Sequence, residues 1–148
     1  RCYEVTSQSL KSLFECLNDE GVNIAGTILK PNMVTSGSMA ENQASVQEVA
    51  EMTVQCLNEN VPSNLPGITF LSGGQSDVNA TAHLDAMNKI GGFPWKLSFS
   101  YGRALQQPSL KAWLGKKDNI PHAQDALSHR ALMNKLAANG AWNPSLEN

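Results

Sequence analysis

Three short apolar runs, each followed directly by polar residues, constrain the fold of this chain most strongly. They cover residues 24–29, 68–71 and 95–99. Apolar side chains at helical spacing precede or separate them, over residues 6–18, 45–57 and 78–90. Strands that alternate with helices predict parallel pairing through crossover connections, and helices then cover at least one face of the sheet. We therefore expect an α/β fold.

Local signals set some of the element boundaries. Ser45 followed three residues later by Glu48 predicts a capping box at the start of the second helix. Residues 109–136 predict two further helical pieces that are divided near Pro121. From Trp142 onward we expect an irregular tail.

Composition excludes several function classes. The net charge of -2 over 148 residues, with 16% charged residues, gives no electrostatic footprint for nucleic acid or an anionic membrane. No apolar run approaches the roughly 18 residues of a membrane span. The three cysteines are far apart and form no CxxC pair, so we expect reduced thiols in a cytosol-like compartment. The first residue is arginine, which suggests a processed or partial product.

Metal ligation and acid–base roles find little support in the sequence. His83, His122 and His129 are scattered and lack metal-ligand spacing, so surface or packing roles are expected for them. We assign no general acid or base among the carboxylates, because those near the apolar runs, such as Glu48, lie on helical stretches.

The three apolar runs end in groups that could carry chemistry. Lys30 follows the first, Ser72-Gly73-Gly74 the second, and a segment from Ser100 to Arg103 the third. The carboxyl ends of parallel strands lie on one side of a sheet, and ligand sites gather there. We therefore expect these groups to converge in space.

Lys30 has two possible roles. At the end of a buried strand its ammonium would be poorly hydrated, which favours the neutral amine that attacks a carbonyl and forms an imine. Alternatively, it is a lysine whose stem packs on the strand end while its charge reaches water.

The two loops that follow favour a phosphate site. Gly73 and Gly74 lack a Cβ, so an oxyanion can approach their backbone N–H groups, and a helix capped by Ser76 or Asp77 follows. Arg103 adds a cation. The alternatives are a tight turn for the glycines and a surface position for the arginine.

At these residues the sequence resembles the class I fructose-bisphosphate aldolases. The similar segments are residues 26–35, 67–76, 99–106, 110–113 and 115–117. The resemblance implies that Lys30 forms a Schiff base with fructose 1,6-bisphosphate, with no cofactor and no metal. It also implies that the substrate phosphate is bound by Ser72, Gly73, Ser100, Gly102 and Arg103.

The resemblance further implies a (β/α)8 TIM barrel, a fold of typically about 250 residues. Residues 1–148 would form the C-terminal part of that single domain and supply strands six to eight. Members are usually homotetramers, in the cytoplasm or a plastid. Their catalytic carboxylates lie on earlier strands, and their C-terminal tail often closes on a tyrosine. Both are absent here, so we expect the isolated chain to be inactive.

Two alternatives remain. The chain could be a truncated, non-catalytic half-barrel that binds phosphate ligands or a protein partner. Without the resemblance, the pattern would also fit an unrelated doubly wound phosphate-binding domain, which predicts no imine at Lys30.

Overall fold

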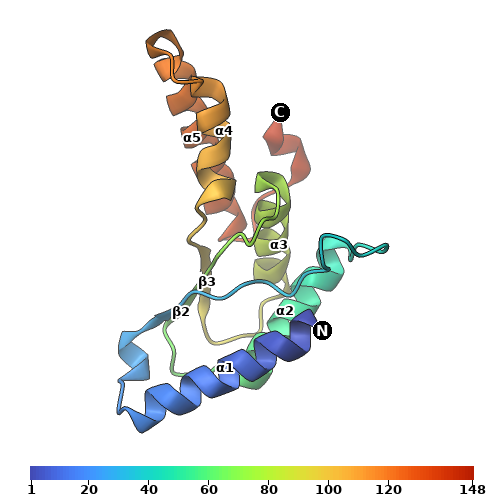
Figure 1. The fold of residues 1–148 in the computed structure, drawn as a ribbon, viewed down its shortest axis with the longest axis vertical. Helices are drawn as coiled ribbons and strands as arrows, with labels where there is room; N and C mark the ends of the chain where they lie inside the picture. The colour runs from blue at the N-terminus through green and yellow to red at the C-terminus, as the bar shows by residue number, and fades with distance from the viewer.

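The computed structural model describes residues 1–148 and contains one three-stranded parallel sheet. Its strands are β1 (Ile28–Leu29), β2 (Gly67–Phe70) and β3 (Lys96–Phe99), in the order β1-β2-β3. Strand pairing aligns Leu29 with Ile68, and Phe70 with Phe99. A helix separates each strand from the next, so the predicted α/β crossovers are confirmed (Figure 1).

Five α-helices and three 3₁₀ turns make up the rest of the regular structure. The helices are α1 (Cys2–Asp19), α2 (Val46–Asn60), α3 (Asp77–Ile90), α4 (Arg103–Trp113) and α5 (Ile120–Ala137). The turns are η1 (Ile24–Gly26), η2 (Lys117–Asn119) and η3 (Pro144–Glu147). No helix combines the length and apolar character that a membrane crossing requires.

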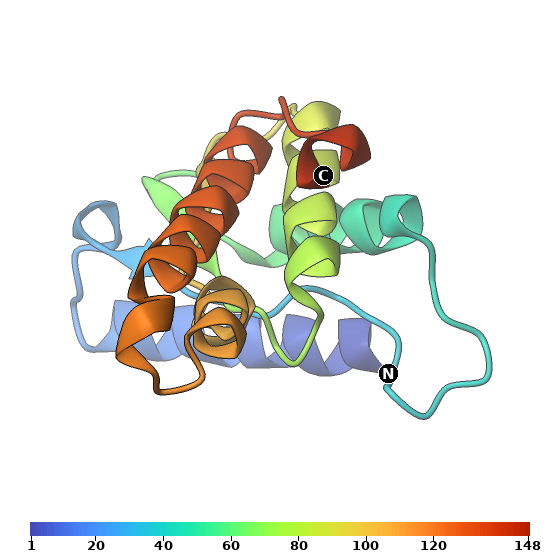
Figure 2. The ribbon, with the colours of Figure 1, turned by 90° about the horizontal axis from the view of Figure 1, so that it is seen from above.

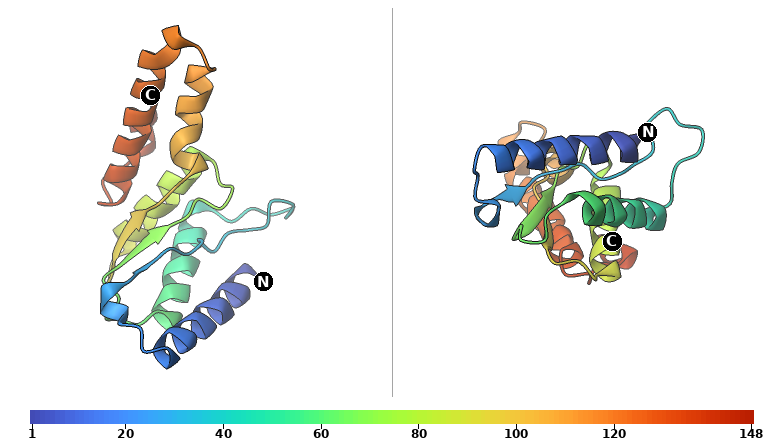
Figure 3. Two further views of the ribbon diagram at one scale, coloured as in Figure 1. Left: turned by 60° about the vertical axis from the view of Figure 1, so that its left-hand side comes forward. Right: turned by 90° about the horizontal axis from the view of Figure 1, so that it is seen from below.

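The core lies on one face of the sheet. Leu29, Ile68, Phe70 and Leu97 are buried together with apolar side chains of the helices. Because side chains alternate along a strand, their neighbours point to the opposite face. There Ile28 is 58% exposed, and Lys96 is exposed as well. The helices lie on one side of the strands, and the other side is uncovered (Figure 3).

Helices α4 and α5 form a hairpin that projects from the sheet (Figure 1). The predicted division into two helical pieces near Pro121 is confirmed, and the break lies at residues 114–119, directly before α5. Helix α4 ends where Leu114 and Gly115 adopt φ of 54° and 72°, whereas Pro121 lies in the first turn of α5. That turn tolerates proline because its N–H groups have no helical acceptor.

Two predicted boundaries differ from the structure. The run over residues 24–29 is a strand only at its end, because residues 24–26 form η1 and the Thr27 hydroxyl donates to the Ile24 carbonyl at 2.9 Å. The predicted irregular tail contains η3, whose start is capped by the Asn143 side chain. This segment lies beside α3 (Figures 1 and 2).

Candidate functional site

The carboxyl ends of the three strands lie side by side, as the sequence predicted. Beyond the strands the pairing continues: the Leu71 N–H donates to the Pro31 carbonyl at 3.0 Å, and the Ser100 N–H donates to the Phe70 carbonyl at 2.9 Å. These bonds hold the segments after β1, β2 and β3 against one another. Lys30, Ser72 and Ser100 therefore lie together at the carboxyl end of the sheet.

Lys30 belongs to a segment that is fixed on the side facing the helices. The Asn32 amide donates to the Thr6 hydroxyl at 3.0 Å, and the Val34 N–H donates to the Thr53 hydroxyl at 2.9 Å. The Lys30 side chain is exposed. The expected poor hydration of this amine is therefore not met within this chain, because nothing covers the face of β1 that carries it.

The loop after β2 exposes its backbone. Gly73 and Gly74 have φ of 55° and 83°, a region that side chains with a Cβ rarely adopt. Ser72 is buried at 7% exposure, and the Gln75 N–H donates back to its carbonyl at 3.0 Å. The loop leads into α3, where the Ser76 hydroxyl accepts from the Asn79 N–H at 3.1 Å. Ser76 is thus the cap of α3.

The segment after β3 starts a helix. Ser100 is half-buried, and Gly102 is the exposed residue before α4, with its carbonyl accepting from Leu105 and Gln106. Arg103 is exposed in the first turn of α4 and faces the loop after β2 across a cleft of about 240 Å³. The other residues lining this cleft are Gly74, Gln75, Ser76, Asp77, Ala104, Gln107 and Lys111.

The clefts do not join all the predicted site residues. Gly73 lines a second cleft, of about 620 Å³, between its loop and residues 35–46. Lys30, Ser72, Ser100 and Gly102 line neither of these two clefts. The common feature of the predicted residues is their place after the carboxyl ends of the strands, with the cationic side chain of Arg103 facing the loop after β2.

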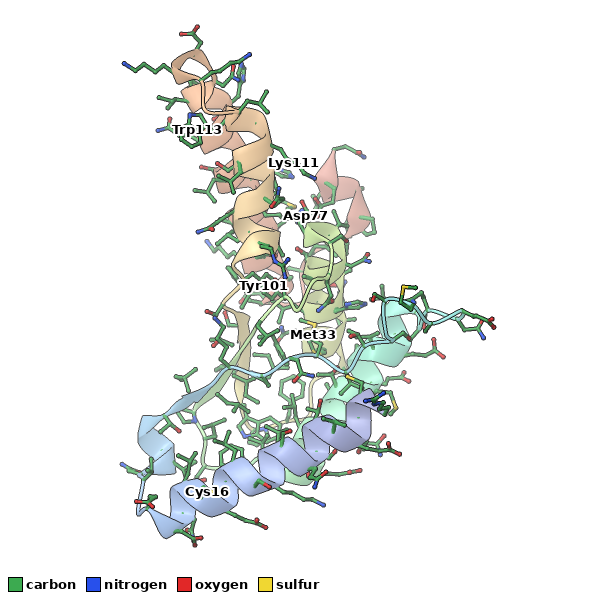
Figure 4. All side chains as sticks on the ribbon, in the orientation of Figure 1. Cys16, Met33, Asp77, Tyr101, Lys111 and Trp113 are labelled. Carbon is green, nitrogen blue, oxygen red and sulfur yellow. The ribbon has the colours of Figure 1, made fainter.

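The sequence did not reveal the contacts of several residues near the carboxyl end of the sheet. Gln75 accepts a hydrogen bond from His83 and donates one to Met33, so it joins the loop after β2 to the Lys30 segment. The Tyr101 hydroxyl donates to the Ala80 carbonyl at 2.8 Å and so ties the end of β3 to α3. Burial raises the pKa of Tyr101, so its proton is held at neutral pH. Figure 4 shows Met33, Tyr101, Asp77 and Lys111 along this side of the molecule.

A signal for Gln75 existed in the sequence, because it directly follows the glycine pair of the loop. Its partners could not be deduced, since they lie on two other segments. No group of three or more His, Cys, Asp or Glu side chains is placed to hold a metal ion.

The nearby carboxylates have structural roles. Glu48 accepts from the Ser45 N–H at 2.7 Å in the capping box of α2. Asp85 is 3% exposed, pairs with the Lys89 ammonium at 2.5 Å and accepts from the Trp142 N–H at 2.9 Å. Both carboxylates are therefore engaged by neighbouring groups of the fold.

Comparison with known proteins adds independent information. The family model described as "Glycolytic: Fructose-bisphosphate aldolase class-I" matches residues 1–148. A probable fructose-bisphosphate aldolase class 1 of Xanthomonas axonopodis pv. citri is 55% identical over 144 residues, which are 95% of this chain and 42% of that protein. The muscle-type fructose-bisphosphate aldolase of Lethenteron camtschaticum is 48% identical over 145 residues, or 97% of this chain and 40% of that protein.

A solved structure agrees. The fructose-bisphosphate aldolase of Plasmodium falciparum, crystallised with TRAP and a small-molecule inhibitor, superposes with a TM-score of 0.93 at 44% identity. The match covers 96% of this chain and 41% of the other. The three-stranded parallel sheet is therefore part of a TIM barrel, and this chain spans about two fifths of the length of these relatives. The chain belongs to the class I fructose-bisphosphate aldolase family.

Proposed function

We propose that the whole protein is a fructose-bisphosphate aldolase of glycolysis and gluconeogenesis, and that residues 1–148 are the C-terminal part of its single barrel domain. The observation that carries this proposal is the shared carboxyl end of the sheet, where Lys30 follows β1 and the segments of Ser72 and Ser100 follow β2 and β3. The family match over the entire chain supports it.

Lys30 supplies the nucleophile in this proposal. Its neutral amine attacks the C2 ketone of fructose 1,6-bisphosphate, and loss of water gives a protonated imine. A base removes the proton of the C4 hydroxyl, the bond between C3 and C4 breaks, and glyceraldehyde 3-phosphate leaves. The electron pair of that bond passes to the iminium and forms an enamine. Protonation at C3 and hydrolysis then release dihydroxyacetone phosphate and regenerate Lys30.

The phosphate next to the reacting ketone is held by Ser72, Gly73, Ser100, Gly102 and Arg103. The backbone of the glycine-rich loop after β2 is open to an oxyanion, and α3 begins directly after it. Arg103 contributes a fixed positive charge with several N–H donors. Anchoring this phosphate brings the ketone to Lys30, which lowers the entropic cost of imine formation.

The remaining parts of the proposal concern the whole protein. The residues that transfer protons lie on strands one to five, outside this chain. Closure of the barrel by those strands covers the face of β1 that carries Lys30. The whole protein is a homotetramer in the cytoplasm or a plastid. A non-catalytic half-barrel is disfavoured, because the relatives that match along nearly all of this chain are named as aldolases.

The experiment is imine trapping. The whole protein is incubated with dihydroxyacetone phosphate, reduced with borohydride, and examined by intact mass and peptide mapping. We expect one stable adduct per chain, on Lys30. Lys30→Arg should lose the adduct and at least about a thousandfold in kcat, since arginine cannot form the imine.

Lys116→Arg, on an exposed turn, is the matched control and should keep both the adduct and the activity. An adduct that maps to another lysine would assign the nucleophile elsewhere. A whole protein that forms no adduct would refute the aldolase proposal.

A further inference from the structure

The side chain of Gln75 lies between three parts of the molecule. Its Oε1 is 2.5 Å from Nδ1 of His83 on α3, and its Nε2 donates to Sδ of Met33 at 3.6 Å. Met33 is 2% exposed and lies three residues after Lys30. One amide therefore connects helix α3, the loop after β2 and the Lys30 segment.

His83 fixes the orientation of this amide. It is 6% exposed, and burial lowers its pKa, so the imidazole is neutral at neutral pH. A carbonyl oxygen can only accept, so Nδ1 of His83 carries the proton and donates to Oε1 of Gln75. The amide nitrogen of Gln75 is then directed to the sulfur of Met33.

The loop itself depends on this anchor. Gly73 and Gly74 adopt positive φ and have no side chains with which to hold a position. The first side chain after them is that of Gln75, whose backbone N–H also closes the turn onto the Ser72 carbonyl at 3.0 Å. The position of Gln75 therefore determines where the N–H groups of the glycine pair lie.

We propose that His83 and Gln75 are positioning residues, which hold the loop after β2 at a fixed place against the Lys30 segment. This inference rests on the proposed function, in which Ser72 and Gly73 bind the substrate phosphate. In this proposal both residues act through the loop that they hold and not by contact with the substrate. They set the distance between the bound phosphate and the amine by holding the two segments together.

The test compares four variants of the whole protein by calorimetric titration with inorganic phosphate, well below the Tm of each. His83→Leu and Gln75→Leu should raise the Kd roughly three- to tenfold, the effect of one lost hydrogen bond. His83→Asn, whose amide can donate in place of Nδ1, should stay within about twofold of the unmodified protein. His122→Leu changes an exposed histidine and is the matched control.

The results separate a positioning role of His83 and Gln75 from a role in packing alone. A wild-type Kd for His83→Leu and Gln75→Leu, or no rescue by His83→Asn, would show that the pair only packs. A lowered Tm with an unchanged Kd for phosphate would likewise show that the pair only packs. Failure of the proposed function is visible separately: phosphate binding without a borohydride adduct on Lys30 refutes the imine chemistry alone. An unmodified protein that binds no phosphate refutes this inference as well.

Discussion

Arg130 places a buried positive charge behind the candidate site. Its side chain is 3% exposed, and its two terminal nitrogens donate to the two carboxylate oxygens of Glu147 at 2.8 and 2.6 Å. The Trp142 indole N–H donates to the same carboxylate at 2.8 Å. Nε of Arg130 is buried without a partner. The Asp77 carboxylate is farther from the guanidinium, at 4.0 Å. Glu147 is therefore the main compensating charge, and a buried charge without a partner is strongly unfavourable.

The Arg130–Glu147 pair predicts a pH-dependent contribution to stability. Partial burial acts to raise the pKa of Glu147, but hydrogen bonds from Arg130 and Trp142 and the charge of Arg130 hold it below its usual value near 4.5. Because the folded pKa is depressed, the stabilisation is complete above the unfolded pKa and is lost as the pH falls through the folded pKa. Glu147→Gln should therefore cost about 3 kcal/mol at pH 7.

Urea unfolding of the whole protein at a series of pH values measures this contribution. The difference between the unmodified protein and Glu147→Gln should narrow below about pH 4. Glu20→Gln removes an exposed carboxylate that makes no ion pair and should change stability little at any pH. A difference for Glu147→Gln that stays constant down to acid pH would show that the charge of Glu147 does not stabilise the fold.

At the scale of single residues, the sequence predicts where the residues that directly follow a strand lie. It does not predict which side chains form pairs across two elements. Lys30, Ser72 and Ser100 could be placed together because parallel strands end on one side. Arg130 and Glu147 are 17 positions apart, and Gln75 and His83 are 8 apart, on segments whose packing is not visible in local patterns. The sequence left the exposure of Lys30 open between two alternatives, since it depends on what covers β1.

Among the elements, α2 has the most complete set of start signals. The Ser45 hydroxyl accepts from the Glu48 N–H at 3.2 Å, and the Glu48 carboxylate accepts from the Ser45 N–H at 2.7 Å. The predicted capping box is therefore confirmed. The Ser45 hydroxyl also donates to the Glu48 carboxylate, at 2.7 Å. The bonds from the Ser45 N–H and from the Ser45 hydroxyl favour the charged form of Glu48 and so lower its pKa.

Removal of this cap should destabilise the protein by a measurable amount. Ser45→Ala leaves the Glu48 N–H without its acceptor and should cost about 1 kcal/mol in the free energy of unfolding. Ser9→Ala, at an exposed position inside α1, is the matched control and should have a much smaller effect. Equal effects of the two substitutions in denaturant unfolding would mean that the cap contributes nothing.

Helix α4 shows why an element can escape prediction. Pro108 lies inside it, where proline removes a backbone hydrogen bond and normally ends a helix. The helix nevertheless runs from Arg103 to Trp113, because it packs along α5 and the Ser109 hydroxyl donates to the Ala123 carbonyl at 2.8 Å. Tertiary contacts of this kind override a local breaker, and the sequence pattern alone does not reveal them.

At the scale of the whole molecule, the sheet is covered on one side only. Ile28 is 58% exposed, and Lys30 and Lys96 are exposed on the same face. The outer strands β1 and β3 each pair on one side only, which leaves edges with free backbone groups. In the TIM barrel of the family this face is directed to the interior and the edges are closed by further strands.

The 148-residue chain alone should therefore associate. An open parallel sheet can bury its uncovered inner face by dimerising, by aggregating or by binding the remaining strands of a barrel. Light scattering should report a mass above that of the 16.0 kDa monomer. Addition of the remaining barrel as a separate polypeptide should convert these species into one defined complex.

A substitution on the uncovered face tests whether that face drives the association. Ile28→Glu should reduce it, because the apolar contact is lost and a carboxylate would have to be buried between the facing sheets. Met39→Glu replaces a side chain that is 94% exposed in the loop before α2 and should leave the mass distribution unchanged. A monomer with a cooperative melt would instead mean that three strands and five helices suffice for a stable fold, and the uncovered face would then need no partner.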